Sequence, residues 1–248
     1  MKARPKIQSF SNVVLSVKHI YKNYGLINAV SDVSFSVEKS QTIGLLGSNG
    51  AGKTTSFNMI VGLVKPDEGD IIFENNSIAK LPMHERARLG IGYLTQEPSV
   101  FRKLTVEENI LAILETCTKD KVEQKARLKS LLEELDLTSI AKSKAYTLSG
   151  GEKRRLEITR ALVTSPRMLL LDEPFSGIDP IAVYEVQKIL IQLKERRMGI
   201  LITDHNVRET LKLVDRAYIM HKGDVCCEGE SKKLVSDAKA REIYLGPD

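Results

Sequence analysis

The amino-acid sequence predicts an α/β fold: a three-layer core with a peripheral antiparallel β element and an inserted block of helices. Continuous apolar runs at 42–46, 168–171 and 200–203 are typical of buried parallel strands. Each run is followed by a stretch with helical patterning, which is the alternation expected of an α/β core. The third observation is that the composition turns helical from about 98 to 164, between the first and second of these runs.

The elements before this helical block belong to the core and to its β element. Residues 33–37 alternate with period two, as a half-buried strand does. The run 42–46 leads into a glycine-rich loop, after which we expect a helix to begin near Lys53. Residues 69–74 predict a further strand, antiparallel and peripheral, and residues 92–94 predict another.

The helical block contains two clear helix patterns. Thr105 and Glu108 form a capping box that opens a helix ending near Leu114. Four leucines recur at helical spacing in the charged stretch that follows: Leu128, Leu131, Leu132 and Leu135. We therefore expect one domain over residues 1–248, divided into a core with its β subdomain, about 1–97 and 165–248, and a helical subdomain, about 98–164.

Strands and helices alternate again after the block. Asp179 precedes Pro180, a favourable start for a helix that we expect to end at Arg197. Another helix should follow the strand 200–203 and end near Val214. The remaining elements are a hairpin of strands 217–221 and 225–227 around 222–224, and a charged helical tail ending at 244–246.

The glycine-rich loop has the composition of a phosphate-binding site. Its glycines, Gly47, Gly50 and Gly52, allow backbone N–H groups to approach an anion at the start of a helix. Lys53 is expected to reach the β- and γ-phosphates, and the Thr54 hydroxyl to bind Mg²⁺. The predicted nucleotide-binding residues are Gly47, Ser48, Asn49, Gly50, Ala51, Gly52, Lys53, Thr54 and Thr55. A plain glycine turn is the alternative, but the Gly-Lys-Thr ending after an apolar strand favours phosphate.

Three further motifs follow the glycine loop in a fixed order. They are the run Leu148-Ser149-Gly150-Gly151-Glu152, the acids Asp172 and Glu173 after an apolar strand, and His205 after the next strand. Asp172 should lie at the carboxyl end of its strand, where such an acid holds Mg²⁺. The four motifs together resemble the ATP-binding cassette (ABC) ATPase family, over nearly the whole chain. The resemblance implies a phosphate-loop NTPase (RecA-like) core that hydrolyses ATP.

The resemblance also implies roles for single residues. Glu173 would polarise the attacking water as general base. Gln96 would touch the metal beside Thr54 and Asp172 and sense the γ-phosphate, which His205 would also contact. Adenine would stack on Tyr24, with Tyr21 as the competing aromatic. Structural alternatives are an ordinary loop acid at 173, a helix-cap histidine at 205, and core packing for either tyrosine.

The run 148–152 predicts a site shared by two chains. Ser149 and Glu152 form a capping box, so the run could simply begin a helix. Consecutive glycines cost backbone entropy at a helix start, and Gly150 and Gly151 therefore favour close approach of a second anion. In the family this anion is the γ-phosphate held by a partner's loop, which implies a head-to-tail homodimer around two ATP molecules. Asp179 matches the family's acid that crosses the seam, although residues 176–178 depart from the commoner sequence.

The segment after Gln96 predicts a contact with a membrane partner. In transporters of the family this region receives a coupling helix, for which Phe101 and Arg102 are the candidates; packing of Phe101 into the subdomain seam is the alternative. Several stretches resemble the ATPase subunits of lipopolysaccharide exporters: 90–97, 171–175, 201–211 and 244–246. This implies two transmembrane permease subunits and export of lipopolysaccharide from the inner membrane. An ATPase of a branched-chain amino acid importer and a soluble ABC ATPase of iron–sulfur cluster assembly are the alternatives.

Composition indicates the compartment. No run approaches the roughly 18 apolar residues of a membrane span, and the basic start lacks a signal-peptide core. We therefore expect a cytoplasmic protein, peripheral on the cytoplasmic face of the inner membrane through its partners. The net charge of +5 favours polyanions weakly, without the arginine tract or aromatic ladder that would indicate nucleic acid. Cys117 and the pair Cys226-Cys227, which should alternate faces along a strand, predict reduced, partly buried thiols.

Overall fold

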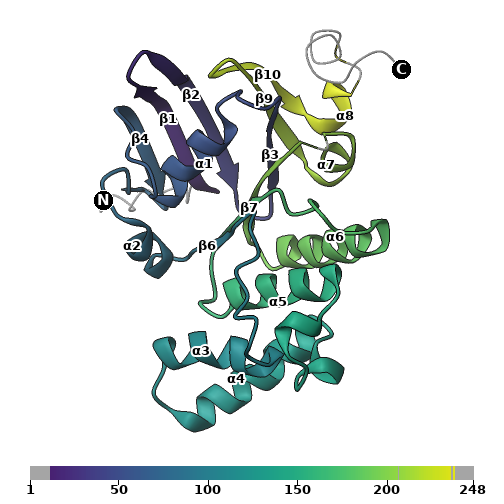
Figure 1. Cartoon of the computed structure of the whole chain (residues 1–248). Coiled ribbons are helices and arrows are strands. Elements are labelled where there is room, and N and C mark those ends of the chain that lie inside the picture. The colour runs from purple at the N-terminus through teal and green to yellow at the C-terminus, as the bar shows by residue number, and fades with distance from the viewer. Residues whose placement is uncertain (1–11, 206, 236, 238–248) are drawn as a thin grey trace, which may run out of the picture.

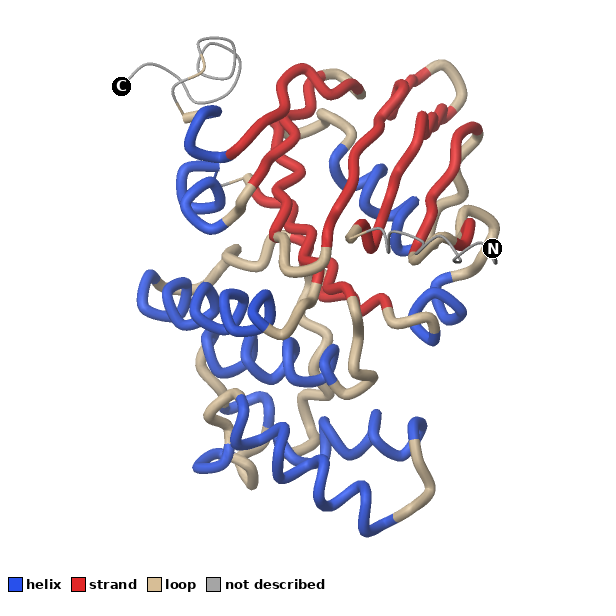
Figure 2. Tube along the Cα trace, turned by 180° about the vertical axis from the view of Figure 1, so that it is seen from behind, coloured by secondary structure: helices blue, strands red, loops and turns tan. Residues whose placement is uncertain are grey.

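The computed structural model describes residues 12–205, 207–235 and 237 and confirms the α/β fold, built on two β-sheets (Figures 1 and 2). The strands are β1 (Val13–Tyr24), β2 (Ile27–Glu38), β3 (Thr42–Gly47), β4 (Glu68–Phe73), β5 (Asn76–Ser77), β6 (Ile91–Leu94), β7 (Met168–Asp172), β8 (Gly199–Asp204), β9 (Arg216–His221) and β10 (Asp224–Glu230). The α-helices are α1 (Lys53–Val61), α2 (Met83–Arg88), α3 (Val106–Cys117), α4 (Lys121–Glu134), α5 (Gly150–Leu162), α6 (Pro180–Glu195), α7 (Val207–Leu213) and α8 (Ser231–Leu234).

The larger sheet has six strands in the order β10-β9-β3-β8-β7-β6. Neighbouring strands are parallel except in the β9–β10 hairpin, which turns at Lys222 and Gly223 as predicted. β3, β7 and β8 are buried along their whole length, which confirms the prediction made from their continuous apolar runs. Because these three strands are parallel, their carboxyl ends meet at one edge, and ligands of open α/β sheets bind at such an edge.

Alternate residues of the larger sheet pack into two separate cores. Leu169 and Leu171 of β7 pack with α3, α4, α5 and α6 on one face, whereas Met168 and Leu170 pack with α1 and the smaller sheet on the other. The smaller sheet is antiparallel, in the order β2-β1-β4-β5, and includes the peripheral strand predicted at 69–74. α1 therefore lies in the core between the two sheets and begins directly after the glycine loop (Figure 1).

Helices α3, α4 and α5 gather at the end of the molecule opposite the smaller sheet (Figure 1). The capping box predicted at Thr105 and Glu108 opens α3, and a second one at Ser149 and Glu152 opens α5. Of the leucines predicted to face inward, Leu131, Leu132 and Leu135 are buried and Leu128 is partly buried against the same core. Both helix starts are thus fixed by local hydrogen bonds, and the helices are then held by apolar packing.

Some elements differ from the predictions. β1 and α2 were not predicted; β1 contains register shifts that break its alternation, and α2 is a short polar helix. α6 ends at Glu195 rather than Arg197. A bulge in β10 lets both cysteines of the pair 226–227 pack against one core instead of alternating, and Cys117 is exposed rather than partly buried.

Two sequence predictions concern the end of the chain and its relation to the membrane. The helical tail was predicted to end at 244–246, and residues 238–248, with that stretch, lie outside the described residues. Within the part of the chain that the structure describes, no helix has the length and apolar character needed to cross a membrane.

Candidate functional site

The glycine loop connects the carboxyl end of β3 to α1, and close packing requires two of its glycines. A Cβ atom on Gly47 would lie 2.4 Å from the Met220 carbonyl oxygen, and one on Gly52 would lie 2.5 Å from the Ala29 carbonyl oxygen. Gly52 also has φ +99°, a left-handed conformation that glycine adopts without strain. The loop is therefore fitted against β2 and β9, while residues 48–50 remain exposed.

Lys53 begins α1 and is buried. Its Nζ donates hydrogen bonds to the carbonyl oxygens of Gly47, at 2.6 Å, and Ser48, at 2.9 Å. Burial lowers the pKa of Lys53, and the negative charges of Glu173 and Asp172 oppose that shift. A phosphate bound in the loop would offer this ammonium group a charge-assisted partner, which is stronger than a neutral carbonyl.

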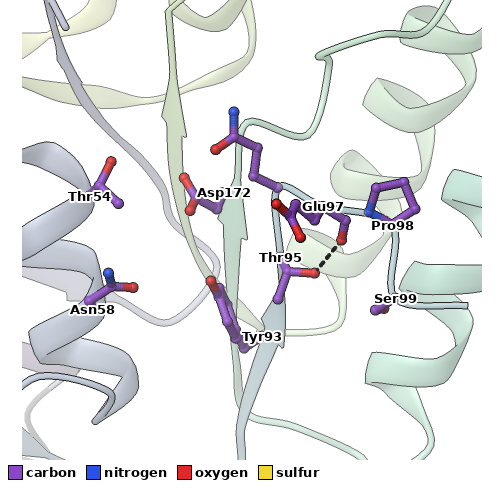
Figure 3. A pocket seen from close by; sticks show the side chains of 9 residues that line it. Thr54, Asn58, Tyr93, Thr95, Glu97, Pro98, Ser99 and Asp172 are labelled. Atoms are coloured by element: carbon purple, nitrogen blue, oxygen red, sulfur yellow. Dashed lines mark hydrogen bonds between the residues drawn. The ribbon is translucent and has the colours of Figure 1, made fainter.

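A pocket beside the loop brings together the three residues predicted to bind metal. Thr54 of α1, Gln96 after β6 and Asp172 at the end of β7 all line it. Figure 3 shows Thr54 and Asn58 across the pocket from Asp172 and Glu97. A hydroxyl, an amide oxygen and a carboxylate suit Mg²⁺, which also keeps water and phosphate ligands. Within the described residues, no group of three or more His, Cys, Asp or Glu side chains could hold a metal.

Asp172 is the buried acid of this pocket. Its Oδ1 accepts a 2.6 Å hydrogen bond from Thr203 Oγ1. Burial raises the pKa of Asp172, and the charge of Glu173 raises it further, whereas Thr203, Lys53 and Arg154 lower it. The ionised carboxyl is therefore destabilised in the protein alone, and a bound cation would offset that cost.

Glu173 lies at the centre of a polar cluster. Gln96 Nε2 donates a 2.9 Å hydrogen bond to Glu173 Oε2, and His205 Nδ1 lies 3.4 Å from the same oxygen. The structure thus brings together the three residues predicted to be catalytic. Glu173 has φ +46°, a left-handed conformation that costs a non-glycine residue about 1–3 kcal/mol and persists only when its surroundings impose it. The result is a carboxylate of fixed orientation next to the phosphate pocket, as a general base requires.

The run 148–152 lies apart from that cluster, and its capping hydrogen bonds are formed within the run itself. The Ser149 hydroxyl accepts from the Glu152 N–H, and Glu152 Oε2 accepts from the Ser149 N–H at 2.8 Å. Gly150 is exposed, and a Cβ atom there would meet nothing closer than 3.3 Å. A Cβ atom on Gly151 would lie 2.8 Å from the Ala182 side chain of α6. The second glycine thus has a packing role within one chain, which the sequence did not predict.

Three other predicted residues lie at the ends of elements. Asp179 caps α6, its side chain accepting from two backbone N–H groups at 3.0 Å each. Tyr24 ends β1 and is 48% exposed, so its ring is available to a ligand. Tyr21 is less exposed, and desolvation followed by the charge of Asp32 raises the pKa of its hydroxyl.

The segment predicted to contact a membrane partner is fixed to two helices. The Phe101 N–H donates to Asn109 Oδ1 of α3 at 2.8 Å, and the Phe101 ring lies 4.6 Å from the Arg160 guanidinium of α5. Phe101 is nevertheless 48% exposed, and Arg102 is exposed. The two side chains therefore lie on a surface whose backbone is well supported.

Sequence reasoning missed two residues that shape the site. Thr203 holds Asp172, and Arg154 of α5 contacts the turn that carries Glu173. The available signal for Arg154 was a charged pair, Arg154 and Glu157, on the face of α5 that also carries the apolar residue Ile158. A pair three residues apart inside an apolar helix face indicates a buried ion pair that needs further partners.

These features define a class of protein: a phosphate-loop nucleotide-binding protein with a carboxylate positioned for hydrolysis. The ABC transporter family model matches residues 30–176, and the chain belongs to this family as an ATP-hydrolysing, ATP-binding domain.

Individual relatives cover nearly the whole chain. The lipopolysaccharide export system ATP-binding protein LptB of Acidithiobacillus ferridurans is 52% identical, over 94% of this chain and 97% of that one. LptB of Escherichia coli K12 is 46% identical, over 94% and 98%. Among solved structures, the ADP conformation of MJ1267, an ATP-binding cassette of an ABC transporter, matches with TM-score 0.85 at 33% identity, covering 95% and 99%. The dimeric post-hydrolysis state of the cassette MJ0796, bound to ADP and Pi, matches with TM-score 0.77 at 25% identity, covering 88% and 98%.

Proposed function

We propose that this chain is the ATPase subunit of a lipopolysaccharide export transporter and works as a homodimer that closes around two Mg²⁺-ATP molecules. The observation that carries the proposal is the convergence of the glycine loop, the Thr54–Gln96–Asp172 pocket and the Glu173 cluster at one sheet edge. In this proposal residues from about 1 to 97 and 165 to 248 form the core with its β subdomain, and residues from about 98 to 164 form the helical subdomain.

The residues act in sequence on the nucleotide. Tyr24 stacks on adenine, in preference to the less exposed Tyr21, and residues 47–55 hold the phosphates. Mg²⁺, held by Thr54, Gln96 and Asp172 with phosphate oxygens, would neutralise charge on the β- and γ-phosphates. Glu173 accepts the proton of the attacking water while His205 contacts the γ-phosphate.

The second half of each ATP site comes from a partner chain. Ser149 and Gly150 are exposed at the start of α5, and the amide end of a helix favours an anion. We assign Ser149, Gly150, Gly151 and Glu152 to the partner's γ-phosphate, with Asp179 at the seam between the chains. The dimeric MJ0796 structure with ADP and Pi supports such an arrangement in this fold.

Lipopolysaccharide export is favoured over the alternatives by the relatives. The name LptB belongs to proteins 46–52% identical over more than nine-tenths of this chain, which favours this cargo over branched-chain amino acids and over iron–sulfur assembly. Two transmembrane permease subunits would hold the ATPase on the cytoplasmic face of the inner membrane. Phe101 and Arg102 are the proposed contacts with their coupling helices.

Replacing the general base tests the ATPase mechanism. Glu173→Gln keeps the size of the side chain and its hydrogen bond to Gln96, so ATP should still bind while turnover falls by about 100-fold or more. With ATP and Mg²⁺ the variant should elute from size-exclusion chromatography as a dimer, and as a monomer without nucleotide. A variant that remains monomeric with ATP and still hydrolyses it would contradict both the role of Glu173 and the shared site.

Co-purification tests the cargo. The chain, affinity-tagged at its N-terminus, is recovered from detergent-solubilised membranes of its own organism, and its partners are identified by mass spectrometry. We expect two large membrane subunits together with lipopolysaccharide. Recovery of a substrate-binding protein for amino acids, or of soluble scaffold proteins, would replace the export function while leaving the ATPase mechanism in place.

A further inference from the structure

Arg154 is a buried cation that the ATPase mechanism does not use. It lies on α5, five residues after the Ser149 cap, and only 7% of its side chain is exposed. Its guanidinium donates to Glu157 Oε2 at 3.0 Å and to the carbonyl oxygen of Thr95 at 3.3 Å. Thr95 directly precedes Gln96, so one end of the guanidinium holds the backbone next to the residue that contacts Glu173.

The other side of the guanidinium holds the turn that carries the general base. Nη2 donates to the carbonyl oxygens of Asp172 and Glu173, at 3.4 and 3.2 Å, and Nε donates to that of Pro174 at 3.0 Å. Three successive carbonyls thus point at one side chain. With the two acceptors of Nη1, all five N–H groups of Arg154 have a partner, which only the planar guanidinium fork can achieve.

This contact explains how the strained turn persists. Glu173 has a left-handed backbone, which needs surroundings that impose it. Arg154 holds the carbonyl oxygens of Glu173 itself and of the residues on both sides of it. The buried carboxylate of Glu157 balances the charge, and its other oxygen accepts from the Ser99 N–H at 2.8 Å, which extends the network along the Gln96 segment.

We infer that Arg154 is a positioning residue for catalysis: it locks the Glu173 turn and the Gln96 segment onto the helix that begins with Ser149-Gly150. Its contacts are all with protein groups, and it acts through Glu173. The orientation of α5 and the orientation of the general base are thereby tied together in one chain. The inference rests on the proposed role of Glu173 as general base.

Two substitutions of Arg154 and one control separate this role from a general loss of stability. Arg154→Met removes all five donors, and Arg154→Lys keeps the charge but not the fork. Both should lower kcat by about 10–100-fold, the usual effect of losing a group that orients a catalytic residue. The KM for ATP and the shift in melting temperature produced by ADP should change less than about twofold, since Lys53 and the glycine loop are untouched. Arg155→Met, on the same helix and paired with Glu185, is the matched control and should keep kcat within about twofold.

The decisive readout is the double variant. If Arg154 acts through Glu173, adding Arg154→Met to Glu173→Gln should not lower the residual kcat further, so the two effects should be strongly non-additive. Additive losses, or a loss of kcat equal to that of Arg155→Met, would overturn the inference. Should Arg154→Met fail to fold, the separate variants Glu157→Gln and Arg154→Lys provide the same test, because each removes only some of the hydrogen bonds around Arg154. A fully active Glu173→Gln protein would refute the proposed function instead, whatever the Arg154 variants do.

Discussion

The edge of the larger sheet and the start of α5 carry the two conspicuous motif groups of this chain, and they are built in opposite ways. At the sheet edge, polar groups from α1, β6, β7 and β8 converge and bond to one another: Lys53 to its own loop, Asp172 to Thr203, and Glu173 to Gln96. At the start of α5, the side chains of Ser149 and Glu152 bond within the capping box, and Gly150 is exposed. The first region brings its polar groups together within one chain, whereas the second presents an exposed helix end, which we propose is completed by the phosphate of a partner chain's ATP.

Mixing two inactive chains gives the largest effect expected from this difference. Lys53→Met should abolish ATP binding by the loop, and Gly150→Ala should abolish the helix-end contact, so each homodimer is inactive. In a mixed dimer one site combines both defects and the other combines both intact halves. An equimolar mixture should therefore recover roughly a quarter of the wild-type activity, because about half of the dimers are mixed and each has one working site. Steady-state ATPase assays across mixing ratios measure this.

The opposite outcome of this experiment would contradict an ATP site divided between two chains. If the two motif groups served one site within a single chain, every mixture would remain as inactive as the separate variants. A control mixture of Lys53→Met with Glu173→Gln should stay inactive, because Glu173 lies beside the phosphate loop of its own chain and each site of the mixed dimer then carries one defect. Recovery there would instead mean that Glu173 of each chain serves the phosphate loop of its partner, against the 2.9 Å contact of Glu173 with Gln96 of the same chain's pocket.

The adjacent glycines of α5, Gly150 and Gly151, differ in the space around them. Gly151→Ala places a Cβ atom 2.8 Å from the Ala182 side chain, so it should destabilise the fold by roughly 1–3 kcal/mol. For a chain of this size that lowers the Tm by about 2–4 °C per kcal/mol. Gly150→Ala would place a Cβ atom 3.3 Å from the Ile178 Cγ2 methyl group and 3.7 Å from the Gly177 carbonyl oxygen, so it should fold normally. It should still lower kcat by about 100-fold, because a methyl group displaces the anion from the helix end.

Thermal unfolding and ATPase assays on both glycine variants test whether Gly151 acts in packing and Gly150 in activity. Equal loss of stability in the two variants would mean that both glycines are packing residues, and the open helix end would lose its functional meaning. An active Gly150→Ala protein with a normal Tm would have the same consequence.

The two regions also differ in how much of their structure follows from the sequence. The sheet edge was predictable because buried parallel strands are continuous apolar runs, and their ends fix where Asp172 and Glu173 lie. The grouping of Thr54, Gln96 and Asp172 followed from the family resemblance, and the pocket contains all three. What escaped prediction depends on distant parts of the chain: the packing of Gly151 on Ala182, and the contacts of Arg154 with carbonyls 18 to 20 residues away. β1 escaped because its register shifts erase the period that would reveal it.

The smallest expected effect is the loss of stability that the buried Asp172 carboxylate causes in the nucleotide-free protein. Burial raises the pKa of Asp172 above its usual value of 3.8, so the folded state disfavours the ionised carboxyl. The stability associated with the protonated form is complete below that value and is lost as the pH rises through the raised pKa of the folded state. Asp172→Asn removes this titration and can still accept the hydrogen bond from Thr203. The nucleotide-free variant should therefore melt at a higher temperature than the wild type at neutral pH, with the difference vanishing toward low pH.

Mg²⁺-ATP should reverse that order. Ligand at 100 times its Kd raises the free energy of unfolding of the wild type by about 2.7 kcal/mol. The variant binds the metal less well, so its free energy of unfolding rises less. Differential scanning fluorimetry from acidic to neutral pH, with and without Mg²⁺-ATP, measures both orders. If Asp172→Asn melts below the wild type in the absence of ligand at neutral pH, the buried carboxylate stabilises the fold. The polar groups of the sheet edge would then stabilise the fold by themselves, as the capping box of α5 does, and no bound cation would be needed to offset the charge of Asp172.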